Sequence, residues 1–312
     1  MTKQSQQLLE KFPIRKSKSQ KAAFRDWLCQ ALREAGYDPQ VEEDKTLVHS
    51  ANVVVGDIEK AELVVGAHYD TCAVLPVPNF ITPRNPVIFL LYQLLLVVVM
   101  MVLAIGAEVL VLRLFDPPMW VALAVVYAVL IFIIWWMMAG KANKHNVNDN
   151  TSGVITLLEV ALSLSEDQRD KIVFVFFDNE EKGLFGSAAF YKEHKTVMKD
   201  KLLLNFDCVS DGDHILLFPS KALKKEAATI ARLEKAFPSA GEKRVAIPTQ
   251  GFAVYPSDQK HFPKGVGVAA LHRAKVIGYY LGRIHTGRDT VMDERNIELL
   301  RKGVLALLSE HC

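Results

Sequence analysis

The stretch Lys171–Ser187, KIVFVFFDNEEKGLFGS, decides the fold. It begins with Ile172–Phe177, a continuous run of β-branched and aromatic residues, which is typical of a strand buried on both faces of a parallel sheet. The run ends abruptly in acidic residues, and two glycines open a turn before a helix-like segment. In open α/β sheets, ligands bind in the crevice beyond the carboxyl ends of the strands. This order of elements predicts an α/β fold with a site after this strand.

Two adjacent glutamates, Glu180 and Glu181, follow this strand. Neighbouring side chains that leave a strand point in opposite directions, so one glutamate can ligate a metal while the other handles a proton. A solvated acidic loop is the simpler interpretation of the pair alone. The functional interpretation therefore depends on partners elsewhere in the chain.

The composition excludes some classes of protein. A net charge of +2 over 312 residues argues against a dedicated nucleic-acid binder, so no nucleic-acid partner is expected. The four cysteines show no CxxC spacing and suggest reduced thiols in a cytosolic setting. The polar N-terminal segment lacks the apolar core of a signal peptide.

Residues 86–140 are much more apolar than the rest of the chain. The run Leu94–Ala107 is uninterrupted, and Met119–Ala139 is apolar throughout and long enough as a helix to span a hydrocarbon core of ~30 Å. A short Pro-Pro turn separates the two runs. We predict a transmembrane helical hairpin at 86–140, in contact with lipid through residues 87–139, that divides one catalytic domain into 1–85 and 141–312. The alternative is a buried core hairpin of a soluble domain.

The flanking charges predict the orientation of the hairpin. Arg84 precedes it, Lys141 and Lys144 follow it, and the turn carries Arg113 beside Asp116. Positive residues stay on the cytoplasmic side, so both ends of the hairpin are expected there. The sequence therefore predicts an integral protein of the inner or plasma membrane with a cytoplasmic catalytic domain.

Further polar candidates fall at expected strand ends or strand-to-helix turns. His68 and Asp70 form an HxD pair after a strand, which suits a metal ligand and the carboxylate that orients it, although a lone histidine is more often structural. Asp149 lies in a tight polar turn before a helix, where a simple capping role is the alternative. Asp207 and His285 follow two later strands in the expected order of elements.

The candidate ligands form a set without thiolates. Two histidines and three carboxylates suit two hydrolytic zinc ions that share one bridging carboxylate. The set is His68, Asp149, Glu181, Asp207 and His285. Cys72 and Cys208 lie close to ligands in sequence, and we interpret them as packing thiols.

Five motifs occur in a fixed order: GAHYDT, NDNTSG, FFDNEEKGLFGS, NFD and HTGRDT. In this order they resemble metallopeptidase family 28, the co-catalytic di-zinc aminopeptidases, over the whole chain except the hairpin. The resemblance implies a three-layer α/β/α sandwich around a mixed, mostly parallel sheet, interrupted here by the inserted transmembrane hairpin. It also implies two zinc ions as cofactors.

The resemblance also implies a role for each metal ligand. Asp149 would bridge the two metals. His68 and Asp207 would complete one site, and Glu181 and His285 the other.

Three further residues receive catalytic roles from the same resemblance. Glu180 would be the general base, and Asp70 would hold the second ring nitrogen of His68. Tyr255 matches a loop position that in some members helps to hold the substrate carbonyl.

Two departures from the family pattern stand out. Here 81 positions separate His68 from Asp149, and the hairpin accounts for most of the excess over soluble members. Where many members read Ser-Asp-His, this chain reads Ser257-Asp258-Gln259, which changes the substrate pocket rather than the metals.

The sequence thus predicts a membrane-anchored zinc exopeptidase, an aminopeptidase that hydrolyses N-terminal residues from peptide substrates. Glutaminyl-cyclase-like or other amide chemistry on the same fold is an alternative, and so is a non-catalytic membrane receptor or scaffold. Short linkers at Cys72–Asn85 and Lys141–Val147 join the ligands to the hairpin, so we expect the site to open toward or beside the membrane.

Overall fold

The fold is built on one mixed sheet. The computed structural model describes residues 1–309, and its nine strands lie in the order β1-β2-β4-β3-β5-β8-β6-β7, with β9 paired to β8. The strands are β1 (Pro39–Asp44), β2 (Ser50–Val55), β3 (Leu63–His68), β4 (Ile172–Phe177), β5 (Leu202–Phe206), β6 (His214–Pro219), β7 (Arg244–Ala246), β8 (Gly265–Ala274) and β9 (Gly278–Tyr280).

The four central strands of the sheet are parallel to one another. Strands β4, β3, β5 and β8 pair in parallel, whereas β2 runs antiparallel to β4 and β6 antiparallel to β8. Parallel strands end at the same edge of a sheet, so the residues that follow β3, β4 and β5 meet there. The prediction of an α/β fold around a mixed sheet is confirmed.

Strand β4 shows why the sheet is covered on both faces. Its even-numbered residues from Ile172 to Phe176 pack into one apolar core, and its odd-numbered residues from Val173 to Phe177 pack into another. The alternation follows from the two-residue period of a strand. A strand that is apolar at every position therefore needs a helical layer on each side.

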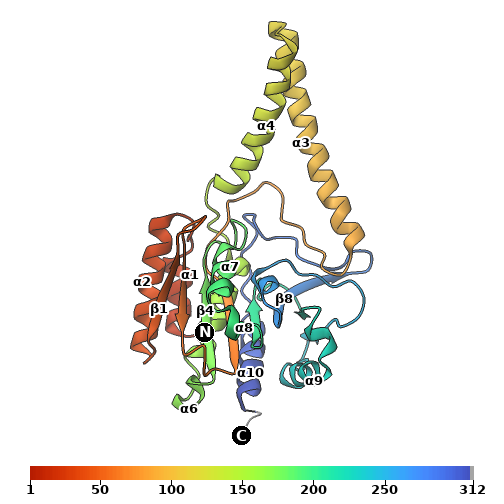
Figure 1. Ribbon diagram of the computed structural model, residues 1–312. Coiled ribbons are helices and arrows are strands. Elements are labelled where there is room, and N and C mark those ends of the chain that lie inside the picture. The colour runs from red at the N-terminus through yellow and green to blue at the C-terminus, as the bar shows by residue number, and fades with distance from the viewer. Residues whose placement is uncertain (310–312) are drawn as a thin grey trace.

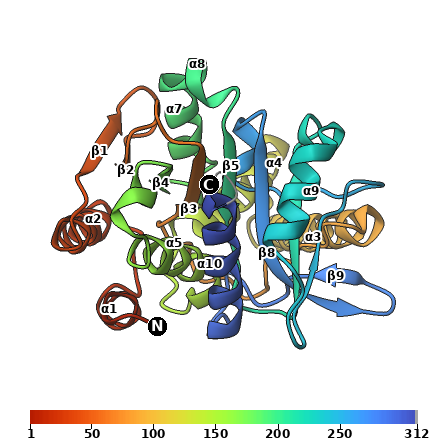
Figure 2. The same ribbon diagram turned by 90° about the horizontal axis from the view of Figure 1, so that it is seen from below.

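Helices supply these two layers. The first core includes residues of α1 (Lys3–Lys11), α2 (Lys18–Glu34), α5 (Ser152–Ala161), α9 (Ala227–Ala236) and α10 (Glu294–Ser309), and the second includes residues of α7 (Phe185–Glu193) and α8 (Lys195–Met198). Figure 2 shows α5 and α10 on one side of the sheet and α7 and α8 on the other. The predicted three-layer sandwich is confirmed. The remaining short segments are α6 (Glu166–Arg169), η1 (Val147–Thr151), η2 (Leu223–Lys225) and η3 (Asp258–His261).

Two long helices project from this domain. Helices α3 (Pro86–Phe115) and α4 (Met119–Ala139) are long and apolar enough to cross a membrane. Figure 1 shows them meeting at their far ends and reaching the domain at separate points. Ala104 and Ala122 are the only buried residues of these two described helices. Most of their large apolar side chains are therefore exposed.

One sequence-based expectation needs correction. His285 does not follow a strand end directly, since β9 ends at Tyr280. His285 lies in the loop between β9 and α10 and adopts a positive φ of 61°.

Candidate metal centre

Three of the candidate ligands meet beneath the surface of the domain. His68 is the last residue of β3, Asp207 directly follows β5, and Asp149 lies in η1, just before α5. The Nε2 atom of His68 lies 3.3 Å from Asp149 Oδ1 and 3.7 Å from Asp207 Oδ1. All three side chains are buried. We call this group the inner half-site.

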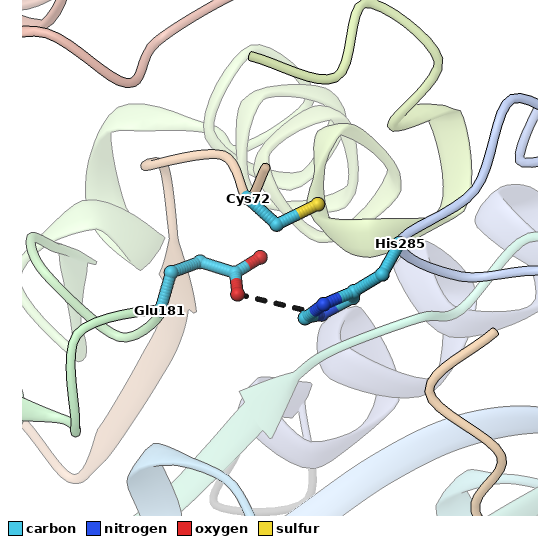
Figure 3. Close-up of side chains that lie close together, drawn as sticks. All are labelled: Cys72, Glu181 and His285. Atoms are coloured by element: carbon cyan, nitrogen blue, oxygen red, sulfur yellow. Dashed lines mark ion pairs between the residues drawn. The ribbon is translucent and has the colours of Figure 1, made fainter. Parts of the chain in front are cut away.

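The other candidate ligands meet on the far side of Asp149. His285 Nε2 lies 3.1 Å from Asp149 Oδ2 and 3.4 Å from Glu181 Oε2. Figure 3 shows Glu181 and His285 pointing toward each other. Asp149, Glu181 and His285 form what we call the outer half-site. One carboxylate thus faces both half-sites, with a different oxygen toward each histidine.

The donor atoms fit a metal ion in each half-site. His68 Nε2, Asp207 Oδ1 and Glu181 Oε1 are buried and have no hydrogen-bond partner among residues 1–309. Buried polar atoms are normally paired, so three unpaired donor atoms in one cluster indicate a missing partner. Ligands at 2.0–2.2 Å from a tetrahedral zinc lie roughly 3.3–3.6 Å from one another, close to the separations seen here.

The charges of the cluster favour a cation. Burial lowers the pKa of His285, but Glu181 and Asp149 outweigh it and raise that pKa to about 9. Burial likewise opposes the shift at His68, whose pKa is raised well above the usual value by Glu180 and Asp149. Burial and the nearby Asp149 raise the pKa of Glu181 to about 8. The carboxylates thus favour the protonated, positively charged form of the histidines. A bound metal ion would supply this positive charge instead and would displace the protons.

A protein-family model matches the part of the chain that follows the hairpin. The model of peptidase family M28 matches residues 138–308, more than half of the chain. The chain belongs to peptidase family M28. Membership indicates a metallopeptidase-type hydrolase.

Solved structures share the M28 fold of this chain at low sequence identity. The glutaminyl cyclase of Porphyromonas gingivalis has a TM-score of 0.65 at 18% identity, over 99% of this chain and 96% of that one. A Zn-dependent exopeptidase from Parabacteroides distasonis has a TM-score of 0.62 at 14% identity, over 98% and 95%. The LapA aminopeptidase of Legionella pneumophila has a TM-score of 0.59 at 15% identity, over 98% and 67%. No curated protein matches the chain in sequence.

Asp70 holds two parts of the candidate metal centre together. Its Oδ1 lies 3.5 Å from His68 Nδ1, and its main-chain oxygen lies 3.2 Å from the same nitrogen. Its two carboxylate oxygens also accept the backbone N–H groups of Glu180 and Glu181, at 3.0 and 3.2 Å. Asp70 therefore orients the candidate ligand His68 and fixes the turn that carries Glu180 and Glu181.

Glu180 lies close to the inner half-site without belonging to the ion pairs described above. Burial raises its pKa well above the usual value, and the neighbouring Glu181 and Asp258 raise it further, against the effect of His68. A carboxylate whose pKa is raised toward the operating pH is suited to proton transfer.

A buried ion pair lies at the end of β4, next to the turn that carries Glu180 and Glu181. Lys21 Nζ lies 2.6 Å from Asp178 Oδ1, and both side chains are at most 4% exposed. The same ammonium donates to Asn179 Oδ1 at 2.7 Å. Removing one partner of such a buried pair costs about 3–5 kcal/mol, because the other charge stays buried and unpaired.

The sequence interpretation missed Asp289. Its carboxylate oxygens accept the backbone N–H groups of Asn148 and Asp149, at 2.7 and 3.0 Å. Burial and the nearby Asp149 raise the pKa of Asp289 to about 7. Asp289 lies in the motif HTGRDT, as His285 does. This motif is the feature of the sequence that could have indicated a role for Asp289.

Tyr255 and Asp258 lie beside the inner half-site. Tyr255 is buried, stacks on Phe218 and donates its hydroxyl to the main-chain oxygen of Asp207 at 3.3 Å. Asp258 is fully buried, and within the described chain neither of its carboxylate oxygens has a hydrogen-bond partner. Burial raises the pKa of Asp258 to about 7. The assignment of Tyr255 to the substrate carbonyl stays a prediction.

Cys72 lies closer to the site than its interpretation as a packing thiol suggested. Its sulfur lies within 4.8 Å of donor atoms of Glu181 and His285 (Figure 3). Burial raises the pKa of its thiol well above the usual value, and Glu181 and Asp149 add to the effect. A neutral thiol is a poor metal ligand, so the carboxylates and imidazoles remain the better donors.

Proposed function

We propose that this protein is a di-zinc exopeptidase that removes N-terminal residues from peptides. The shared carboxylate carries the proposal, since Asp149 presents one oxygen toward His68 and the other toward His285. Zinc ions bound there would supply Lewis acidity, which polarises a scissile carbonyl and lowers the pKa of bound water. His68 and Asp207 would hold one ion, and Glu181 and His285 the other.

Glu180 is the proposed general base. It takes a proton from the attacking water and delivers it to the leaving amine, as a carboxylate with a raised pKa can do. Asp70 keeps the backbone of Glu180 in place during this transfer, because it accepts the N–H group of that residue. Tyr255 is the proposed contact for the substrate carbonyl.

A release assay tests the activity. The full-length protein is incubated with a panel of aminoacyl-amides and short peptides, and released N-terminal amino acids are quantified with and without a zinc chelator. The proposal expects chelator-sensitive release. Absence of release from every substrate by zinc-loaded protein would contradict it.

Glutaminyl-cyclase-like chemistry is the second candidate. Glutaminyl cyclases occur repeatedly among the similar structures, from Porphyromonas gingivalis, Tannerella forsythia and Fimbriiglobus ruber. Peptides with N-terminal glutamine separate the two reactions, because cyclisation releases ammonia and keeps the residue in the peptide. A non-catalytic receptor or scaffold is less well supported, since the chain keeps all five candidate ligands and Glu180.

We further propose that α3 and α4 anchor the protein in a bilayer. Both helices are long and apolar, and their large side chains are mostly exposed. The lysines and arginine that flank the hairpin support a cytoplasmic catalytic domain. Removing residues 86–140 and joining the ends with a short polar linker tests the anchor. We expect a soluble, folded, zinc-binding domain, and an insoluble product would assign the hairpin to the core instead.

A further inference from the structure

A cavity of about 600 Å³ lies between the hairpin and the candidate metal centre. Glu181, His285 and Cys72 line its domain end, and residues of both α3 and α4 line its other walls. A larger groove of about 950 Å³ along α10 includes none of the candidate ligands. The cavity, which we call the chamber, therefore joins the proposed catalytic site to the proposed membrane segment.

The splayed arrangement of the two helices creates the chamber. Ala104 of α3 and Ala122 of α4 are buried, and small side chains of this kind allow two helices to approach closely. Nearer the domain they separate, as Figure 1 shows. In this part the chamber walls come from apolar residues of both helices, including Leu96 and Met100 of α3 and Ile133 and Met137 of α4.

The base of the hairpin is tied to the outer half-site. The backbone N–H of Leu75 donates to the main-chain oxygen of His285 at 2.7 Å, and that of Asn143 donates to Cys72 at 3.1 Å. Leu75 itself lines the chamber. Leu75 of the chamber wall and the candidate ligand His285 are thus joined by a backbone hydrogen bond. This bond fixes the position of that wall relative to the site.

The charged groups of the chamber lie at its domain end, whereas its helical walls are mostly apolar, with Gln93 of α3 as a polar exception. Lys16 and Lys182 line it there, and Lys16 Nζ donates to the main-chain oxygen of Met138 at the end of α4. A soluble polar peptide gains little from an aliphatic wall, whereas an apolar segment gains in proportion to the apolar area it buries. The polarity gradient fits a substrate with a polar terminus at the metals and an apolar segment between the helices.

We propose that the chamber admits substrates from the bilayer, namely amphiphilic peptides whose apolar segment lies between α3 and α4 while the N-terminus reaches the metal pair. This inference rests on the proposed function and adds the substrate class. It assigns α3 and α4 a part in substrate selection besides anchoring.

Two peptides and a matched pair of variants test this inference. The peptides share their first four residues, and one ends in a polar segment while the other ends in an apolar segment that partitions into vesicles. The full-length protein is reconstituted in vesicles of phosphatidylcholine and phosphatidylglycerol. Leu96→Trp narrows the chamber, because Leu96 lines it. Leu94→Trp is the control, since Leu94 is on the same helix, 58% exposed and outside the chamber lining.

The inference expects a higher kcat/KM for the apolar-tailed peptide with the wild-type protein. Leu96→Trp should reduce kcat/KM for that peptide by about tenfold or more, since apolar pocket contacts discriminate by roughly 10–200-fold. The polar peptide and the Leu94→Trp variant should change little. If Leu96→Trp binds less zinc than the wild type, Met100→Trp, one turn further from the domain, replaces it in the same comparison.

The outcomes separate the two proposals. If the wild-type protein cleaves neither peptide, the proposed function fails. If it cleaves both equally and the chamber variants affect neither, the exopeptidase stands and the bilayer route is wrong. Equal losses for both peptides, or equal losses in Leu96→Trp and Leu94→Trp, would also contradict the bilayer route.

Discussion

The inner and outer half-sites share Asp149 but differ in their surroundings. In the inner half-site, the His68 side chain is 1% exposed and Asp207 is 7% exposed. In the outer half-site, Glu181 is 10% exposed and His285 is 18% exposed. The outer residues also line the chamber, whereas His68 and Asp207 do not.

This difference suggests a division of labour. Inner ligands come from the ends of β3 and β5, whose parallel pairing fixes their spacing. Outer ligands come from a turn and a loop tied to the base of the hairpin. We expect the inner metal to be held more rigidly and the outer metal to meet the substrate, because a catalytic metal needs an accessible position.

The largest expected effect comes from the residue that both half-sites share. Asp149→Ala should lose both zinc ions and all measurable hydrolysis, because each histidine loses the carboxylate that faces it. Metal analysis of the purified variant checks this. If one ion remained tightly bound, the bridging role would be wrong.

Glu180→Gln should separate catalysis from metal binding. The substitution removes the proposed base and keeps the shape of the side chain, so zinc content should stay at the wild-type level. Activity should fall by about 10²–10⁴-fold, the usual contribution of general-base assistance. A variant that keeps half of its rate would exclude Glu180 as the base.

Asp289→Ala should weaken both half-sites together. Asp289 accepts two backbone N–H groups of the turn that carries Asp149, so its loss disturbs the shared ligand and not one histidine alone. Loss of a residue that orients a ligand typically costs 10–100-fold in metal affinity, so we expect about that loss. Competition with a fluorescent chelator measures it, and loss of only one ion would contradict the expectation.

The smallest expected effect, counted per pH unit and per displaced proton, is the pH dependence of zinc binding. The metal-free site holds protons on His285 and Glu181, whose pKa values are raised to about 9 and about 8. Zinc must displace these protons, so its affinity should rise with pH up to about 9 and fall as the pH falls. Each displaced proton contributes about tenfold per pH unit. Titration calorimetry in buffers of different ionisation enthalpy should show proton release, and a pH-independent affinity would contradict the assignment.

The sequence predicts those parts of the molecule that depend on local pattern. The apolar run at Ile172–Phe177 requires cover on both faces, and the structure provides it. Four of the candidate ligands follow strands or precede a helix, so the sheet edge brings them together. Apolar length alone predicts the helices of the hairpin.

Features that depend on distant contacts are not visible in the sequence. Asp289 supports Asp149 across 140 positions, and Lys21 reaches Asp178 across 157. Both are charged residues that would fit an exposed surface equally well. His285 was expected after a strand, but its loop has no such periodic pattern. The chamber depends on the angle between α3 and α4, which neither helix encodes by itself.

Zinc content tests the central claim most directly. The full-length wild-type protein is purified in detergent, equilibrated with excess zinc and separated from free metal. Elemental mass spectrometry then gives the zinc concentration, which is divided by the protein concentration. The shared position of Asp149 between two histidines predicts two zinc ions per chain. One ion per chain, or none, would contradict the di-zinc centre.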